Sequence, residues 1–251
     1  MWTQIRAGTI LLGGALRGVA QYRADLGFAV AAGAAYQTIG FLTVWVILAR
    51  FETIAGWGMP EMALMYGMRL CSHALWVIPF NQLVYLTDRI RHGEFDRFLV
   101  RPANPLIQLM TTRINIATFG DLLGGVTILG VALTLVDVDW NAWRVGFAAL
   151  ALLGGAGAEV GVQLALSSLA FRFVKVDETR FIADGVFSEF GNYPAKIFGT
   201  AGQWTLTAVI PVVFVAYLPT SVLLDRVDDT GLPAALAYAS PAVGALVAAA
   251  G

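Results

Sequence analysis

The chain has 251 residues, of which 58% are hydrophobic and 13% are charged. Soluble domains carry about 45–50% apolar and about 25% charged residues, so this composition excludes a disordered chain, a nucleic-acid binder and an ordinary cytosolic enzyme. The formal net charge of −1 leaves no polybasic or acidic tail. Cys71 is the single cysteine, which excludes a disulfide or a thiolate metal site within one chain.

Residues 1–24 are predicted to form an amphipathic helix that lies on the membrane surface. Apolar residues recur there at alternating spacings of four and three, which places them on one face of a helix flanked by arginines. A solvated arm is the alternative. The arginines also interrupt the apolar stretch and argue against a cleavable signal.

Six apolar segments follow that are long enough to cross a bilayer. A helix of about 20 residues covers the hydrocarbon core, so the segments predict an all-α polytopic membrane protein. Because no charged residue follows the last segment, we expect the natural chain to continue past Gly251. The predicted spans are residues 27–49, 61–87, 114–136, 143–171, 204–224 and 232–251.

Residues 178–196 do not fit this scheme. Asp184, Glu189 and Pro194 lie there among aromatic and aliphatic residues, so the stretch is too polar to face lipid and too apolar for a free loop. We expect an interfacial or re-entrant amphipathic helix that ends at Pro194. If this stretch crosses the membrane, residues 204–224 become a broken or re-entrant element.

The basic residues predict the orientation of the chain. With the N-terminus inside, twelve of the 16 basic residues fall in inner segments and three in outer segments, while Arg69 lies within a span. Cytoplasmic segments of membrane proteins carry an excess of lysine and arginine. Both termini are therefore predicted to be cytoplasmic.

Four ionisable residues lie inside predicted spans, where charge is costly and therefore indicates function. At about 1.5 Å per residue, Asp121 lies roughly 10 Å deep and Glu159 near the midplane. Arg69 and His73 share a helical face in the outer half, where Arg69 can extend to the interface. All four are candidates for a pathway or conformational role. A structural hydrogen bond is the alternative for Glu159, and pairing with Arg113 or an N-terminal arginine is the alternative for Asp121.

Small residues spaced by four occur in the third and fourth spans. Such spacing lets two helix backbones approach closely, so these glycines are expected to mediate helix packing. The two pairs are Gly120 with Gly124, and Gly157 with Gly161.

The sequence contains no motif for catalysis. It lacks the zinc-protease, serine-hydrolase and phosphate-loop patterns, so we expect no ATP hydrolysis and no bound cofactor in this chain. His73 and His92 flank the second span from opposite sides and cannot share a metal ion. No metal site is predicted.

Residues 88–113 form the most informative loop. It contains five arginines, two prolines and a short predicted helix with Phe95, Phe98 and Leu99 on one side. A helix that offers aromatic side chains between arginines suits docking into a groove on a soluble partner. Contact with anionic lipid explains the same pattern equally well.

The run from Gly93 to Pro102 resembles the signature loop of a bacterial ABC-transporter permease family, in the clade of type-2 exporter permeases that are about this long. Residues 20–25, 56–58, 66–67, 193–194 and 210–211 agree with it in type and spacing, as do Glu61 and Pro219. The resemblance implies six transmembrane helices, an N-terminal interfacial helix and a coupling helix between the second and third spans. It places Gly93, Glu94, Phe95, Asp96, Arg97, Phe98, Arg101 and Pro102 at the contact with an ATPase.

The same resemblance implies a set of partners. Two ATP-binding-cassette ATPase subunits would hold ATP and Mg²⁺, and a second permease, either a paralogue or a second copy, would complete the pathway in the bacterial inner membrane. Export is the expected direction, and the sequence does not reveal the cargo.

Two other classes of function remain possible from the residues alone. An autonomous ion-coupled carrier, or a substrate-binding membrane subunit, would show inverted repeats, and we find no convincing repeat. A lipid-modifying membrane enzyme would need Glu159, Asp121 and His73 to converge, which the depth estimates do not favour.

Overall fold

The computed structural model describes residues 13–14, 23–101, 103–112, 115–173 and 176–251. These residues form helices and no strand, and their only β-type pairing is the isolated bridge between Ile54 and Trp57. The all-α prediction is confirmed. The surface helix predicted for residues 1–24 lies almost entirely outside the described residues.

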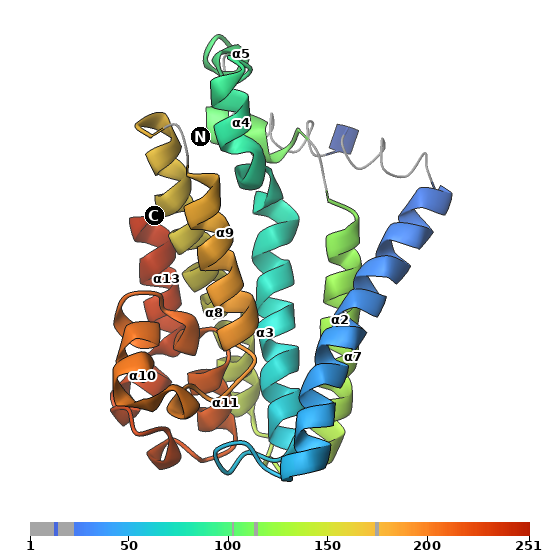
Figure 1. The fold of residues 1–251 in the computed structure, drawn as a ribbon, viewed down its shortest axis with the longest axis vertical. Coiled ribbons are helices and arrows are strands. Elements are labelled where there is room, and N and C mark those ends of the chain that lie inside the picture. Colours follow the sequence, from blue (N-terminus) through green and yellow to red (C-terminus); the bar gives the residue numbers. More distant parts are fainter. Residues whose placement is uncertain (1–12, 15–22, 102, 113–114, 174–175) are drawn as a thin grey trace.

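The longest helices run along the long axis of the molecule (Figure 1). The central helix α3 packs against both α7 and α8, while α2 covers α7 and α13 covers α8. The bounds are α2 Arg23–Phe51, α3 Met59–Phe80, α7 Ala117–Leu135, α8 Ala142–Ser168 and α13 Ser240–Ala250.

Within the described residues, three helices are long and apolar enough to cross a membrane, namely α2, α7 and α8. The helix α3 is 22 residues long but carries Arg69 and His73, and α13 has 11 residues. A bent pair of helices between residues 195 and 223 would add a fourth span. The count of six spans therefore stays a prediction.

The segment predicted to span at residues 204–224 is not one continuous helix. The chain there forms α10 (Gly199–Ala208), the 3-10 turn η5 (Val212–Phe214) and α11 (Tyr217–Leu223), and the two halves of this segment are bent by 81°. Pro211 lies at the break and accounts for it. Proline has no amide hydrogen for a helical hydrogen bond, and it disfavours helical geometry at the residue before it. The side chains of α11 are buried in the main core.

Residues 178–196 lie against the bundle. The helix α9 (Asp177–Gly185) continues into the π-helical turn η3 (Val186–Phe190), and α9 packs on α8. Arg180, Ala183 and Phe187 are buried on one side, while Phe181 and Ile182 are exposed on the other. The helical stretch ends at Phe190, four residues before the predicted stop at Pro194.

The chain that follows α3 leaves the bundle at one end (Figure 1). The α-helix gives way to 3-10 geometry directly after Pro79 and Phe80. The short elements at this end are η1 (Asn81–Tyr85), α4 (Leu86–Arg91), α5 (Asp96–Leu99) and α6 (Pro105–Met110). The remaining short elements are η2 (Leu169–Phe171), η4 (Ala195–Phe198), η6 (Asp228–Thr230) and α12 (Ala234–Tyr238).

The paired glycines lie where helix backbones touch. A Cβ atom on Gly120 would lie 2.8 Å from the Ala34 amide nitrogen of α2, and one on Gly157 would lie 2.7 Å from the Gly244 carbonyl oxygen of α13. Gly161 meets the backbone of α13 in the same way, at Ala248 N, and Gly124 has looser contact with α2.

Candidate functional site

A buried carboxylate joins the two central helices. Glu159 of α8 is 1% exposed, and its Oε2 accepts a hydrogen bond of 2.5 Å from Trp76 Nε1 of α3. The same oxygen lies 2.8 Å from His73 Nδ1. His73 and Trp76 are three residues apart, so one face of α3 presents both to α8.

The depth estimate that separated His73 from Glu159 is wrong. It counted residues from the predicted ends of each span, and such a count does not give the relative heights of α3 and α8, whose side chains His73 and Glu159 lie 2.8 Å apart. Arg69 does not extend to the outer interface either. It is 4% exposed, and its guanidinium lies 5.4 Å from the centroid of the Tyr66 ring.

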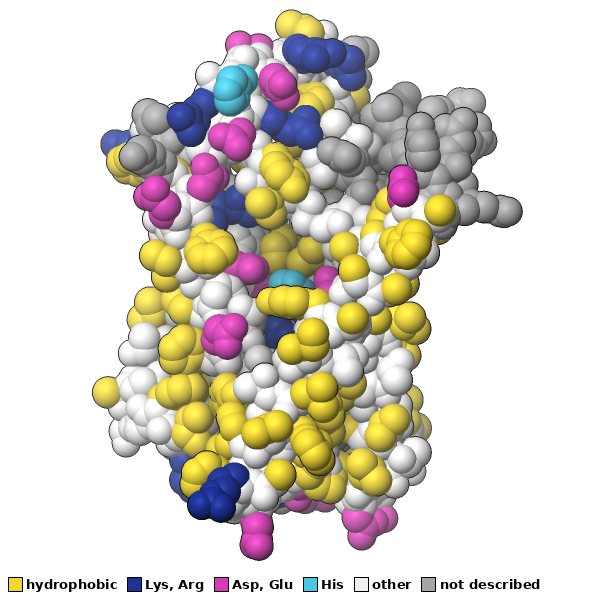
Figure 2. Space-filling model, turned by 45° about the vertical axis from the view of Figure 1, so that its right-hand side comes forward, with side chains coloured by type: hydrophobic (Ala, Val, Ile, Leu, Met, Phe, Trp, Pro, Cys, Tyr) yellow, Lys and Arg dark blue, Asp and Glu magenta, His cyan; other side chains and the backbone are white. Residues whose placement is uncertain are grey.

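A cavity of about 420 Å³ opens beside the His73–Glu159 pair, between α3, α7, α8 and α9. We call it the central cavity. Figure 2 shows a hollow at mid-height in which acidic, basic and histidine side chains are visible between apolar surfaces. Its lining comprises His73, Trp76, Val77, Asn81, Val84, Asn115, Thr118, Asp121, Gln163, Asp177, Arg180, Phe181 and Asp184.

The structure thus brings three predicted residues together. Asp121 and His73 line the central cavity, and Glu159 is bonded to His73, which is the convergence that a membrane enzyme would require. Asp121 Oδ1 accepts a hydrogen bond of 2.8 Å from Gln37 Nε2 of α2, and its predicted partner Arg113 lies outside the described residues. Arg69 does not line the cavity.

Sequence reasoning missed Trp76 and Gln163 as members of this site. Helical spacing could have indicated both, because Trp76 lies three residues after His73 and Gln163 four residues after Glu159, each on the same helical face as its neighbour. Both residues are uncharged and lie in apolar stretches, so a search for ionisable residues does not select them.

The short helix α5 is held by its aromatic residues, which point inward. Phe98 is 8% exposed and packs with Leu83, Leu86 and Leu109. Phe95 stacks edge-on against Phe171, with ring centroids 5.1 Å apart. Phe98 is therefore turned toward the chain itself and away from a partner, while Phe95 is half-buried against Phe171.

A hydrogen-bonded side chain ties α5 to α6. Gln108 Nε2 donates to the Phe98 carbonyl oxygen at 3.0 Å and to the Ala103 carbonyl oxygen at 2.7 Å. Asn104 caps α6, since its Oδ1 accepts from the Leu106 amide at 2.9 Å. These bonds fix α5 relative to α6.

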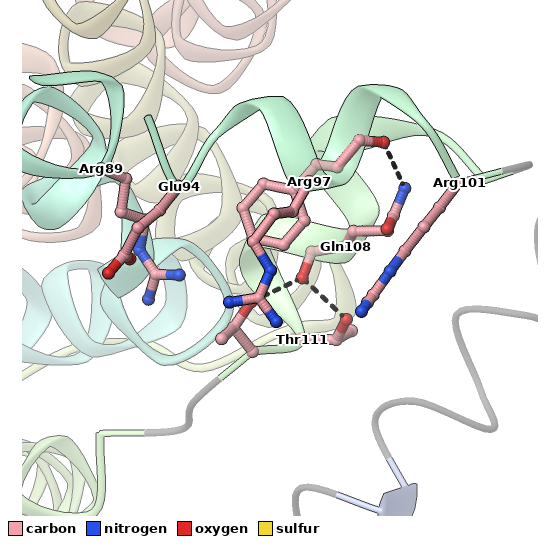
Figure 3. Close-up of a pocket in the computed structure, with 8 residues that line it drawn as sticks. Arg89, Glu94, Arg97, Arg101, Gln108 and Thr111 are labelled. Carbon is pink, nitrogen blue, oxygen red and sulfur yellow. Dashed lines mark hydrogen bonds between the residues drawn. The ribbon is translucent and has the colours of Figure 1, made fainter. Parts of the chain in front are cut away.

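The outward side of α5 combines apolar and basic residues. Leu99 is 60% exposed and Val100 is 84% exposed. Arg97 and Arg101 point into a shallow pocket of about 290 Å³ over Thr111 (Figure 3). We call Arg97, Leu99, Val100 and Arg101 the α5 surface, and the exposed acidic residues Glu94 and Asp96 lie beside it.

Gly93 ends one helix and does not begin the next. Its φ of +70° is left-handed, and its amide donates to the Ile90 carbonyl oxygen at 3.1 Å, as at the C-terminus of α4. The helix α5 begins three residues later, at Asp96. Pro102, which the resemblance places at the ATPase contact, lies outside the described residues.

Comparison with known protein families decides between the classes of function. The family model of the ABC-2 family transporter proteins matches residues 34–250 of this chain. The chain belongs to the ABC-2 family of transporter proteins. It is therefore an ABC-transporter permease and a multi-pass membrane protein, and permeases of this family associate with an ATPase subunit.

Family membership favours the permease over the autonomous carrier and the lipid-modifying enzyme, although His73, Asp121 and Glu159 do converge. In this permease the central cavity lies among membrane helices, and α5 lies at one end of them. Neither the curated proteins nor the solved structures that were compared include a match to the chain.

Proposed function

We propose that this permease is one of two transmembrane subunits of an ATP-driven exporter in the bacterial inner membrane. Two separate ATPase subunits bind ATP and Mg²⁺ and hydrolyse the nucleotide, and this chain hydrolyses none. The second permease is a paralogue or another copy of the chain. The α5 surface is the observation that carries the proposal.

The α5 surface has the properties of a docking site for a soluble partner. Adjacent exposed apolar side chains with a polar rim are typical of an interaction surface, and Leu99 and Val100 form such a pair between two arginines. Nucleotide-driven movement is transmitted only through a contact that favours one of two states. The packing of Phe98 and the bonds of Gln108 make α5 a rigid contact.

The helix α2 supports pairing with a second permease. It packs mainly on α7, and only 17% of its apolar stretch is buried. Aromatic side chains along its free side are exposed, including Phe28, Tyr36 and Trp45. Such a face is satisfied by lipid or by another apolar helix surface.

The test is co-purification of an ATPase subunit with the tagged full-length chain after gentle extraction from its native membrane. Mass spectrometry identifies the subunits, and ATP hydrolysis is assayed on the same sample. We expect a co-purifying ATPase and, beside it, either a second permease or only the tagged chain. A chain that emerges without an ATPase and without ATP hydrolysis would overturn the proposal.

Matched variants locate the contact. The double variant Leu99→Asp/Val100→Asp is expected to lose the ATPase without losing thermal stability, because both side chains are exposed. The control variant Leu106→Asp, at an exposed site of α6, is expected to keep the ATPase bound. Phe98→Ala is expected to lower stability by about 3 kcal/mol, because it empties a packed site. Retention of the ATPase by the double variant would move the contact away from α5.

A further inference from the structure

The central cavity contains buried polar groups that lack a partner among the described residues. Gln163 is 2% exposed and Arg180 is 5% exposed, and both line the cavity. Gln163 Oε1, Asp177 Oδ1 and Arg180 Nε make no hydrogen bond within the described structure. Buried polar atoms in folded proteins are nearly always paired, so these atoms need ordered water or a bound molecule as a partner.

The charges around the cavity specify the chemistry of that molecule. Three carboxylates, those of Asp121, Asp177 and Asp184, line the cavity with Arg180 as the only arginine or lysine among its lining residues. His73 is already engaged by Glu159. The unpaired amide oxygen of Gln163 adds another acceptor. A molecule that carries N–H donors and positive charge would satisfy this excess of acceptors and negative charge.

The remaining walls are apolar. Trp76, Val77, Val84 and Phe181 line the same cavity. An aromatic ring also attracts a nearby cation through its π-face. Small-molecule sites typically combine such walls with a few convergent polar groups in about 300–1,000 Å³, a range that includes this cavity.

We propose that the central cavity binds an amphipathic amine, with the protonated amino group at Asp177, Asp184 and Gln163 and the apolar part against Trp76 and Phe181. Binding of the amine in this cavity does not depend on an ATPase. The further step, that the bound amine is the transported cargo, rests on the proposed export function.

The first experiment measures binding to the purified full-length chain, with its co-purifying subunits, in nanodiscs of phosphatidylcholine. This neutral lipid limits adsorption of the amine to the membrane. The probe is tritiated 4-phenylbutylamine, and the size-matched competitors are 4-phenylbutan-1-ol and 4-phenylbutyrate. We expect saturable binding of the probe that unlabelled 4-phenylbutylamine displaces and 4-phenylbutyrate does not. The affinity of the alcohol should be at least about tenfold lower than that of the amine, because the alcohol lacks one charged hydrogen bond.

Two variants place the bound amine in the central cavity. Asp184→Asn and Gln163→Leu are each expected to weaken binding about tenfold, because each removes an acceptor for the amino group. Asp228→Asn makes the same charge change at an exposed residue outside the cavity and should bind as the unsubstituted chain does. Elution as a single species in size exclusion shows that each variant is folded.

Three results would overturn the proposal: no saturable binding of the probe, competition by 4-phenylbutyrate as strong as that by the unlabelled amine, or unchanged binding of the probe by both cavity variants. The competition series uses the unsubstituted chain, so it decides even if a variant does not fold. Co-purification of the ATPase is recorded in the same preparations. An ATPase without amine binding contradicts only the cavity proposal, and amine binding without an ATPase contradicts only the proposed function.

Discussion

Glu159 determines how α3 and α8 meet in the middle of the permease. A carboxylate at this depth is costly unless donors surround it, and Trp76 and His73 supply two donors to one oxygen. The other oxygen, Oε1, has no partner within the described residues. The side chain therefore holds two helices together and also carries unused hydrogen-bonding capacity next to the central cavity.

Replacement of Glu159 separates these roles. Glu159→Leu leaves Trp76 Nε1 and His73 without an acceptor and is expected to destabilise the permease by about 1–3 kcal/mol. Glu159→Gln keeps an acceptor oxygen and should cost less. The midpoint of thermal unfolding in detergent measures both variants, and equal midpoints for leucine and glutamine would show that the hydrogen bonds do not stabilise the contact.

At the scale of elements, helix packing depends on glycines in pairs of contacting helices. The backbones of α8 and α13 approach so closely that a Cβ on Gly154 would lie 2.5 Å from the Pro241 Cα. The helices α2 and α7 approach in the same way at Gly33 and Gly120. These two contacts place α2 on α7 and α13 on α8, the two helices that flank the central helix α3.

A matched pair of alanine variants in α7 tests this packing. Gly120→Ala is expected to lower the unfolding midpoint, because the new methyl group meets the α2 backbone and overpacking typically costs about 1–3 kcal/mol. A methyl group on Gly130 would have no neighbour within 4 Å, so Gly130→Ala should be neutral or stabilising. Equal effects of the two changes on the midpoint would contradict a close contact at Gly120.

At the scale of the whole molecule, the two ends of the helix bundle differ in character. The α5 surface projects at one end, and the turn between α2 and α3 lies at the other (Figure 1). At this second end Arg226 bonds Asp229 at 2.8 Å, lies 3.8 Å from Glu61 and stacks over Trp57. The start of α3 and the segment after α11 are thereby held together.

Labelling of single cysteines tests the proposed orientation. Replacement of Cys71 by serine removes the native thiol, and Glu94→Cys and Asp228→Cys each introduce a thiol at an exposed residue. We expect a membrane-impermeant maleimide to label position 228 in right-side-out vesicles and position 94 in inverted vesicles. Labelling of both positions from the same side would contradict an outer Asp228 and a cytoplasmic α5.

Composition and the lengths of apolar runs determined the helical membrane class, and the Gly93–Pro102 run pointed to the family. These properties are sums over neighbouring residues, so no tertiary information is needed to read them. The sequence analysis did not predict the break at Pro211, although proline acts on its own backbone, and the bend of 81° depends on how α11 packs.

Only the tertiary structure decided which residues meet. His73 and Glu159 are 86 residues apart, and their contact depends on the heights and rotations of α3 and α8. Periodicity showed that Phe95 and Phe98 share a side of α5 but not whether that side faces the chain itself or a partner. The direction of a helical face is set by the neighbouring surface that buries it, and that surface comes from distant parts of the chain.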